Sequence, residues 1–191
     1  MSTSTATPAN WDFVKFGCRL TSEVYVGLGA NLGNPRKTFE EALGLISSFA
    51  EVLAGSRLYC SAPFGFPDQP DFVNAVAKLK TVLEPLALLR ELRTVEQALG
   101  KKVVRENGPR VIDLDLLMHG DHVIGSEELI LPHPGVAERD FVLLPLCDLA
   151  PEVLHPVLRK SFNELKASLA DQHVVGTPED WSLDLFSDTS E

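Results

Sequence analysis

An apolar run that carries two carboxylates at alternate positions constrains the fold of this chain more than any other feature. Asp113 and Asp115 lie within the stretch 111–118, and the other residues of that stretch are all apolar. Side chains on a strand point alternately to the two faces of a sheet, so both carboxylates lie on one face. The opposite face is then formed by Ile112, Leu114, Leu116 and Met118. The sequence therefore predicts a strand with a core on one side and a polar site on the other.

Two unpaired carboxylates in the middle of a sheet repel each other and lose hydration, so a cation normally lies close to them. Magnesium, a hard divalent ion that prefers oxygen ligands, fits Asp113 and Asp115. The alternative is a solvated sheet face that carries two ordinary acids, and the Asp-x-Asp pattern alone does not distinguish the two.

The order of strand and helix patterns predicts an α+β fold. Asn34-Pro35 and Pro85 are helix starts, and Gly100 is a helix stop. The expected elements are a strand at 24–29, a helix from 35, strands at 52–60 and 71–80, a helix from 85 and the strand with the aspartates. This β-α-β-β-α-β order is the ferredoxin-like arrangement, an antiparallel sheet with both helices on one face and the ligand site on the other. We also expect an edge hairpin within 123–131 and a last helix at 162–169.

The alternating strand at 71–80 adds to the predicted open face. Its apolar set, which is assigned to the core, consists of Val73, Ala75, Ala77 and Leu79. Phe72 and Asn74 then lie on the other face, beside the two aspartates. An aromatic ring, an amide and two carboxylates on one surface indicate a binding site rather than a core.

Length and charge bound the domain organisation. With 191 residues and 45% hydrophobic content, the chain suits one domain with a substantial core. From Asp171 onward it carries six acidic residues and no Lys or Arg. We therefore expect a loosely ordered N-terminal extension at 1–22, the folded domain at 23–170 and an acidic C-terminal tail at 171–191.

Charge and hydropathy also exclude some classes of partner. The net charge of −10 argues against non-specific nucleic-acid binding. No apolar run approaches the roughly 20 residues that a membrane-spanning helix needs, and the first ten residues lack the order of a secretory signal. The sequence predicts a cytoplasmic protein that does not bind membranes, and it leaves the oligomeric state open, with a monomer favoured.

Three further patterns allow more than one interpretation. Gly27-Leu28-Gly29 with Gly33 is not a dinucleotide fingerprint, because the third glycine comes one residue late, and a tight strand-to-helix turn is favoured. The basic loop 101–107 is either solvated or a contact for nucleotide phosphates. His133, between two prolines, is either a buried or capping histidine or, with Arg110 and Arg139, a phosphate ligand.

Six motifs follow one another in the order and approximate spacing found in one enzyme family. They are Asn31-Leu32-Gly33-Asn34-Pro35, Pro63-x-Gly65, Asp68-Gln69-Pro70-Asp71-Phe72-Val73-Asn74, Gly108-Pro109-Arg110-x-x-Asp113-x-Asp115, Pro132-His133 and Arg139-x-Phe141. Over about residues 23–169 the chain resembles the 6-hydroxymethyl-7,8-dihydropterin pyrophosphokinases of folate biosynthesis. The resemblance implies transfer of the β,γ-diphosphate of ATP to the hydroxymethyl oxygen of the pterin, with release of AMP.

The resemblance also implies roles for individual residues, with Asp113 and Asp115 as ligands of two magnesium ions. The residues implied in catalysis are Arg110, Asp113, Asp115 and Arg139. Those implied in binding the nucleotide are Leu89, Glu96, Lys101, Arg105, Arg110, His133 and Arg139. Those implied in binding the pterin are Ser61, Ala62, Phe64, Phe72, Asn74 and Phe141, with the rings of Phe72 and Phe141 as the two walls of a slot.

Two other functions remain open at this point. One is a ferredoxin-like, metal-dependent nucleotidyltransferase, which uses paired aspartates to transfer the nucleotide part of ATP. The other is a non-catalytic ligand-binding module of the same fold. The products separate the three functions, because AMP indicates a pyrophosphokinase, pyrophosphate a nucleotidyltransferase, and unchanged ATP a binding module.

Overall fold

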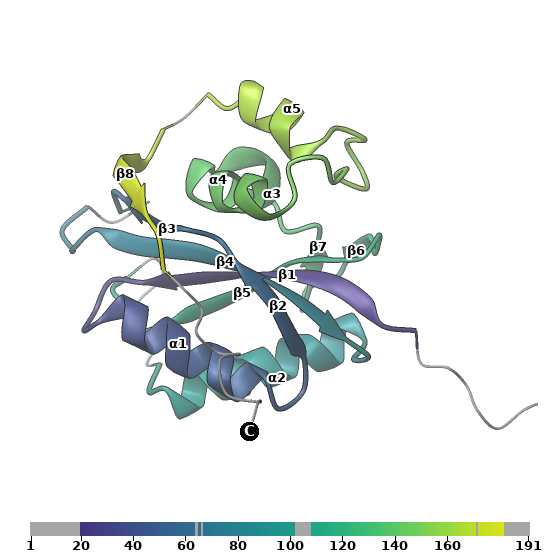
Figure 1. Ribbon diagram of the computed structural model, residues 1–191, viewed down its shortest axis with the longest axis horizontal. Helices are drawn as coiled ribbons and strands as arrows, with labels where there is room; N and C mark the ends of the chain where they lie inside the picture. Colours follow the sequence, from purple (N-terminus) through teal and green to yellow (C-terminus); the bar gives the residue numbers. More distant parts are fainter. Residues whose placement is uncertain (1–19, 64, 66, 102–107, 171, 182–191) are drawn as a thin grey trace, which may run out of the picture.

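The computed structural model describes residues 20–63, 65, 67–101, 108–170 and 172–181. Its elements form three layers, with the sheet in the middle (Figure 1). Helices α1 (Pro35–Ile46) and α2 (Pro85–Ala98) cover one face of the sheet. Three short helices lie over the other face, namely α3 (Gly135–Glu138), α4 (Asp140–Leu149) and α5 (Phe162–Ala167).

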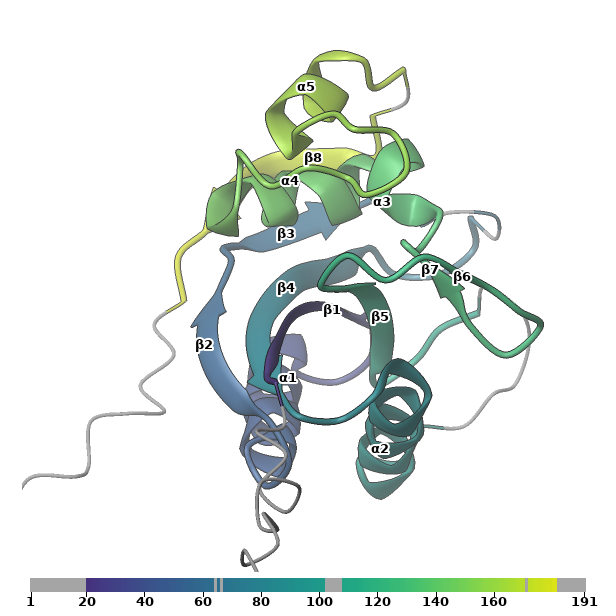
Figure 2. The same ribbon diagram turned by 90° about the vertical axis from the view of Figure 1, so that its right-hand side faces the viewer.

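The main sheet is antiparallel, and its strands follow the order β5-β1-β4-β3-β8, with β2 also paired to β4. The strands are β1 (Ser22–Ala30), β2 (Glu51–Gly55), β3 (Leu58–Ser61), β4 (Phe72–Thr81), β5 (Asp113–His119) and β8 (Val174–Glu179). Figure 2 shows β4, β1 and β5 between the α1–α2 layer and α4. The predicted ferredoxin-like α+β fold is confirmed.

The helix starts follow from the local sequence. Asn34 caps α1, because its side-chain oxygen accepts a hydrogen bond from the backbone N–H of Lys37 at 3.2 Å. Proline occupies the first turn of both α1 and α2, where a missing N–H breaks no hydrogen bond within the helix. The apolar faces of these helices pack on the sheet, and the largest fully buried side chains there include Phe39, Leu43, Ile46, Leu88 and Leu92.

The sheet face that carries the aspartates is covered over part of its length. Helix α4 packs on β4 and β3, and α5 packs on α4. A second apolar cluster fills this side of the sheet and includes Tyr25, Val76, Leu117, Leu143 and Phe162. The space left for a ligand is therefore a cavity beside the start of α4 rather than the whole face.

The strand predicted at 52–60 is two strands, β2 and β3. The strand is interrupted at Ser56 and Arg57, where the Ser56 hydroxyl accepts a hydrogen bond from the Val76 N–H at 2.9 Å. The Ser56 N–H donates to the Val76 carbonyl oxygen, also at 2.9 Å. Ser56 thus maintains the contact with β4 across the interruption, and β2 and β3 pair with different halves of β4.

The prediction that Met118 lies on the face covered by α1 and α2 is wrong. Tyr25 pairs with Met118 and Val26 pairs with Leu116, so Leu117 is an extra residue in β5. A bulge of this kind reverses the alternation of the residues that follow it. Leu117 and Met118 consequently both belong to the apolar cluster under α4.

The fold extends beyond the domain boundary expected at residue 170. β8 pairs with the outer edge of β3, starting with Val174 opposite Ser61. Trp181 then places its ring in the core at 7% exposure, with 6.0 Å between its centroid and that of Phe39. The indole N–H donates to the backbone oxygen of Ser56. The first half of the predicted acidic tail is therefore part of the sheet and the core.

Other predicted elements agree with the structure. The edge hairpin consists of β6 (Ile124–Gly125) and β7 (Ile130–Leu131), and the last predicted helix is α5. Residues 1–19 of the predicted N-terminal extension lie outside the described residues. Within the described part of the chain the longest helix has 14 residues, and no helix there is long and apolar enough to cross a membrane.

Candidate active site

A cavity lies between the strands β1, β4 and β5 and the start of α4. It brings together side chains that are far apart in the sequence. Those predicted above that line it are Ser61, Ala62, Phe72, Asn74, Arg110, Asp113, Asp115, Arg139 and Phe141. The surface expected from the alternation of two strands is one wall of this cavity, and residues from α4 form another.

Two glycines of β1 form the floor of the cavity. Gly27 pairs with Asp115 and Gly29 pairs with Asp113. A Cβ added at Gly27 would lie 3.4 Å from the Leu117 side chain, so even a small side chain would occupy space there. Both glycines lie within β1, in agreement with the strand predicted at 24–29, and the predicted strand-to-helix turn follows β1, with Gly33 at a φ of 71°. Glycines at alternate positions of an apolar strand were the signal that could have identified the floor.

Asp113 is bound by two cationic side chains of the protein. Its Oδ1 accepts a hydrogen bond from Lys101 Nζ at 2.6 Å, and its Oδ2 accepts one from the Arg110 guanidinium. Lys101 Nζ also donates to Glu96 Oε1 at 2.6 Å. Glu96 is buried, and the same oxygen accepts the backbone N–H of Leu114 at 2.7 Å. Lys101 therefore bridges a buried carboxylate of α2 and the cavity carboxylate of β5.

Burial and neighbouring charges shift the pKa values of Asp115, Glu96 and Lys101. Burial raises the pKa of Asp115 to about 6, and the charge of Asp113 adds to this effect while Lys101 and the nearby arginines oppose it. Burial also raises the pKa of Glu96, although the hydrogen bond from Lys101 opposes the increase. Burial acts to lower the pKa of Lys101, but the two carboxylates outweigh it and raise that pKa. Nearby cations thus compensate the charge of Asp115 only in part.

Asp113 and Asp115 fit a magnesium site that is completed by a substrate. Both present oxygen ligands on one cavity wall. Among the described residues, no group of three or more His, Cys, Asp or Glu side chains could hold a metal ion. Magnesium suits a site with two carboxylates, because it retains water molecules and commonly takes further ligands from substrate phosphates. Burial holds the pKa of Asp115 above its ordinary value, and a cation bound beside it would lower that pKa and favour the ionised form.

Each aromatic ring of the cavity lies next to an arginine. The Arg110 guanidinium carbon is 5.5 Å from the centroid of Phe72, and that of Arg139 is 5.9 Å from the centroid of Phe141. Phe72 comes from β4 and Phe141 from α4, the elements on two sides of the cavity. Aromatic faces stack on flat heterocycles, so the cavity can receive such a ring with positive charge beside it.

Asn74 and Ser61 form a hydrogen-bonded pair in the cavity wall. The Asn74 side-chain N–H group donates to the Ser61 hydroxyl at 2.9 Å and to the Tyr59 carbonyl oxygen at 3.3 Å. The amide oxygen of Asn74 points toward the cavity floor, 3.6 Å from a Cβ added at Gly29. The pair therefore offers an amide oxygen and a hydroxyl to the polar edge of a ligand.

Asn31 has a role in the site that the sequence did not indicate. This buried side chain accepts a hydrogen bond from the Arg110 N–H at 2.8 Å. Its own N–H group donates to Gln69 Oε1 and to the Pro70 carbonyl oxygen, both at 3.0 Å. Asn31 thus ties the segment that precedes Phe72 to the segment that precedes the aspartates. Its position in a presumed turn concealed this function, because the contacts span 38 and 79 residues of sequence.

His133 lies beside Arg139 rather than in the lining of the described cavity. A Cβ added at Gly135 would lie 3.1 Å from His133 Nδ1 and 3.2 Å from Arg139 Cδ, so both side chains border this glycine. The Gly135 N–H donates to His133 Nδ1 at 3.1 Å. Burial and the charge of Arg139 lower the pKa of His133. A neutral His133 with this hydrogen bond carries its proton on Nε2.

The remaining predicted residues are placed as follows. Leu89, a residue of α2, is buried in the core, and Glu96 reaches the site through Lys101; neither lines the described cavity. Phe64 and Arg105 lie outside the described residues, as does the rest of the basic loop at 102–107.

Comparison with known proteins identifies the family. The model of the family 7,8-dihydro-6-hydroxymethylpterin-pyrophosphokinase (HPPK) matches residues 25–151. The chain belongs to the HPPK family. The matched range includes both aspartates and both aromatic rings of the cavity. HPPK membership assigns pyrophosphokinase activity in folate biosynthesis, with ATP as the co-substrate.

Individual HPPK relatives differ in length. The 2-amino-4-hydroxy-6-hydroxymethyldihydropteridine pyrophosphokinase of Aquifex aeolicus is 40% identical over 143 residues, which cover 75% of this chain and 89% of the relative. Folic acid synthesis protein fol1 of Pneumocystis carinii is 45% identical over 152 residues, which cover 79% of this chain but 20% of the relative. This chain thus spans most of the Aquifex protein and about a fifth of the Pneumocystis protein.

Solved structures support the HPPK fold. Plasmodium falciparum HPPK-DHPS A437G with STZ-DHP has a TM-score of 0.66 to this chain at 17% sequence identity. The similarity covers 82% of this chain and 47% of that one. The ferredoxin-like arrangement therefore agrees with that of an HPPK-containing protein.

Proposed function

We propose that this HPPK transfers the β,γ-diphosphate of ATP to the hydroxymethyl oxygen of 6-hydroxymethyl-7,8-dihydropterin and releases AMP. The observation that carries the proposal is the single cavity that contains two carboxylates, two arginines and two aromatic rings. Carboxylates and arginines suit a metal-bound triphosphate, whereas aromatic rings suit the flat pterin. The reaction requires both ligands in one place, with the attacking oxygen in line with the bond that breaks.

The phosphate side of the reaction is assigned to Arg110 and Arg139. Each guanidinium lies next to one of the aromatic rings, so both would lie at the boundary between a pterin bound by those rings and the triphosphate. There they would stabilise the charge on the transferred group and on the departing AMP oxygen. His133 would donate from Nε2 to a phosphate oxygen, and Lys101 and Arg105 would add further contacts.

Asp113 and Asp115 would hold two magnesium ions, which neutralise and align the triphosphate when bound. Lys101 and Arg110 bind the oxygens of Asp113 in the structure. A magnesium ion there would compete with these two cations for Asp113, and phosphate oxygens would offer Lys101 and Arg110 new partners. Glu96 keeps Lys101 beside the site during this exchange.

The pterin side is assigned to Phe72 and Phe141 as stacking faces and to Asn74 with Ser61 as the groups that bind the polar edge. Backbone groups of Ala62 and Phe64 complete this edge in the proposal. Leu89 is assigned to the adenine only through the family resemblance. A cytoplasmic location and a monomeric state are likewise proposals, made from charge and hydropathy.

The test is an incubation of the full chain with ATP, magnesium and 6-hydroxymethyl-7,8-dihydropterin, followed by separation of the nucleotide products. AMP is the expected product; pyrophosphate would support a nucleotidyltransferase, and unchanged ATP a binding module. Asp115→Asn should lower turnover by about 1,000-fold or more, equivalent to about 4 kcal/mol of transition-state stabilisation. Asp121→Asn, at an exposed aspartate, is the matched control and should retain turnover. Near-normal turnover of Asp115→Asn at saturating magnesium would contradict the metal assignment.

A further inference from the structure

The segment that leads into β8 joins two walls of the cavity. On one side, the Ala62 N–H donates to the His173 carbonyl oxygen at 2.9 Å. On the other side, Asp140 Oδ2 accepts hydrogen bonds from the N–H groups of His173 and Val174 at 2.7 and 2.8 Å. Ala62 lines the cavity, and Asp140 lies between two residues that line it. His173 and Val174 therefore connect the end of β3 to the start of α4.

Asp140 fixes the first turn of α4 to this segment. Its side chain is 5% exposed, and its Oδ1 also accepts the N–H of Phe141 at 2.8 Å. The carboxylate thus accepts three backbone N–H groups, one from α4, one from His173 just before β8 and one from Val174 at the start of β8. A buried carboxylate that loses such donors pays a large desolvation cost. Arg139 and Phe141, on either side of Asp140 in the chain, are consequently held in position.

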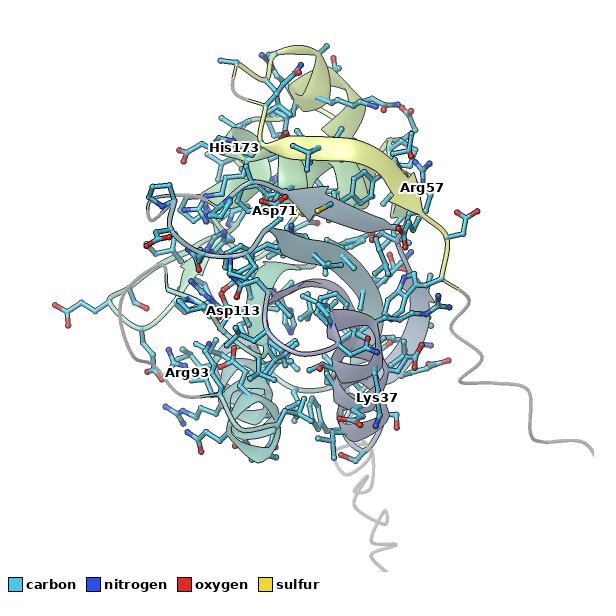
Figure 3. All side chains as sticks on the ribbon, turned by 90° about the vertical axis from the view of Figure 1, so that its left-hand side faces the viewer. Lys37, Arg57, Asp71, Arg93, Asp113 and His173 are labelled. Atoms are coloured by element: carbon cyan, nitrogen blue, oxygen red, sulfur yellow. The ribbon has the colours of Figure 1, made fainter. Side chains whose placement is uncertain are left out.

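The side chain of His173 contacts Phe141, the ring of α4 that is assigned to the pterin. Its ring packs edge-on against Phe141, with 6.0 Å between centroids and 88° between planes. Figure 3 shows His173 at the start of β8, at the opposite end of that strand from Arg57. His173 is not among the described residues that line the cavity, so any effect on a ligand must act through Phe141 or the backbone that it holds.

We propose that His173 is a positioning residue for the pterin. Its ring and the hydrogen bonds of the 173–174 backbone set the orientation of Phe141 and the distance of that ring from Ala62. The inference rests on the proposed function, because Phe141 is assigned to the pterin there. His173 lies beyond the range 25–151 that the family model matches, so the C-terminal segment of this chain contributes to the recognition of its substrate.

The test separates pterin binding from nucleotide binding. His173→Ala removes the ring but leaves the backbone hydrogen bonds, and we expect the KM for the pterin to rise about five-fold. The Kd for α,β-methylene-ATP with magnesium, measured by calorimetry, should stay within about two-fold. His173→Phe keeps a ring against Phe141 and should retain the wild-type KM within about two-fold. Val175→Ala, two residues further along in β8 and with 42% exposure, is the matched control and should change neither constant.

A purely structural role predicts a different result, with a lower Tm and equal losses for both ligands. Equal losses, an unchanged pterin KM in His173→Ala, or the same loss in His173→Phe would each overturn the inference. The wild-type reaction in the same series keeps the two proposals apart. Absence of AMP there refutes the proposed function, whereas normal wild-type turnover with an unaffected His173→Ala variant refutes only the role of His173.

Discussion

Trp181→Ala tests whether the C-terminal segment stabilises the body of the fold. The Trp181 side chain is 7% exposed, and its ring contacts Phe39, which is fully buried under the sheet. Its indole N–H donates to the backbone oxygen of Ser56, between β2 and β3. The substitution therefore removes both an apolar contact with α1 and a polar contact with the sheet.

The loss in the free energy of unfolding can be worked out from the burial of the ring and its hydrogen bond. A buried tryptophan removes about 150–250 Å² from solvent, which at about 25 cal/mol per Å² corresponds to roughly 4–6 kcal/mol. This value is an upper one, because the unfolded chain already buries part of its surface. The lost hydrogen bond adds about 1 kcal/mol, and comparable core substitutions cost about 3–5 kcal/mol. We expect the free energy of unfolding to fall by about 3–5 kcal/mol.

Urea denaturation measures this change, and thermal unfolding should show a Tm lower by about 10 °C. Trp181→Phe keeps most of the ring and should cost about 1–2 kcal/mol. Leu158→Ala, at a residue with 46% exposure, is the control and should cost less than about 0.5 kcal/mol. A loss below about 1 kcal/mol for Trp181→Ala would show that the C-terminal segment is not anchored in the core.

Other substitutions test the site and the contacts that support α4. Burial acts to raise the pKa of Asp148, but hydrogen bonds from Arg57 and Tyr59 outweigh it and lower that pKa below the ordinary 3.8. Their stabilisation is present above the ordinary pKa and is lost as pH falls through the folded value. Asp148→Asn should therefore cost about 1–2 kcal/mol at pH 7 and progressively less as pH falls below 3.8. A cost that does not change with pH in urea titrations would contradict this. Phe72→Ala should weaken pterin binding by about 1–3 kcal/mol and leave ATP binding nearly unchanged, and equal calorimetric losses for both ligands would show that the ring is only structural. Lys101→Met leaves the buried carboxylate of Glu96 without its cation. The free energy of unfolding should fall by about 1–3 kcal/mol, and an unchanged denaturation midpoint would disprove this.

Local patterns predicted the part of the site that lies on strands. Because strand side chains alternate with a period of two, Phe72, Asn74, Asp113 and Asp115 could be assigned to one face without knowledge of the pairing, and all four line the cavity. The motif matches added Arg139 and Phe141 from α4, and the structure places both at the same cavity. The roles of these residues in catalysis and binding stay predictions.

Long-range contacts account for what the sequence did not reveal. Lys101 bonds Glu96, five residues before it, and it reaches Asp113 because β5 packs beside α2. The position of Met118 depends on a bulge in the pairing of β5 with β1, which no pattern within β5 shows. The segment 174–179 lacks apolar alternation, and its pairing with β3 joins residues more than 110 positions apart. Such contacts are decided by the assembled fold, not by local propensity.

β8 also determines how the sheet ends. An exposed strand edge offers unpaired N–H and C=O groups to other chains, and β3 would present such an edge if β8 were removed. β8 is a poor template itself, because Gly176 has a φ of 71° and Pro178 has no N–H to donate. Loss of residues 172–181 would therefore convert an edge that resists further pairing into one that favours aggregation, so the segment protects the solubility of the folded chain.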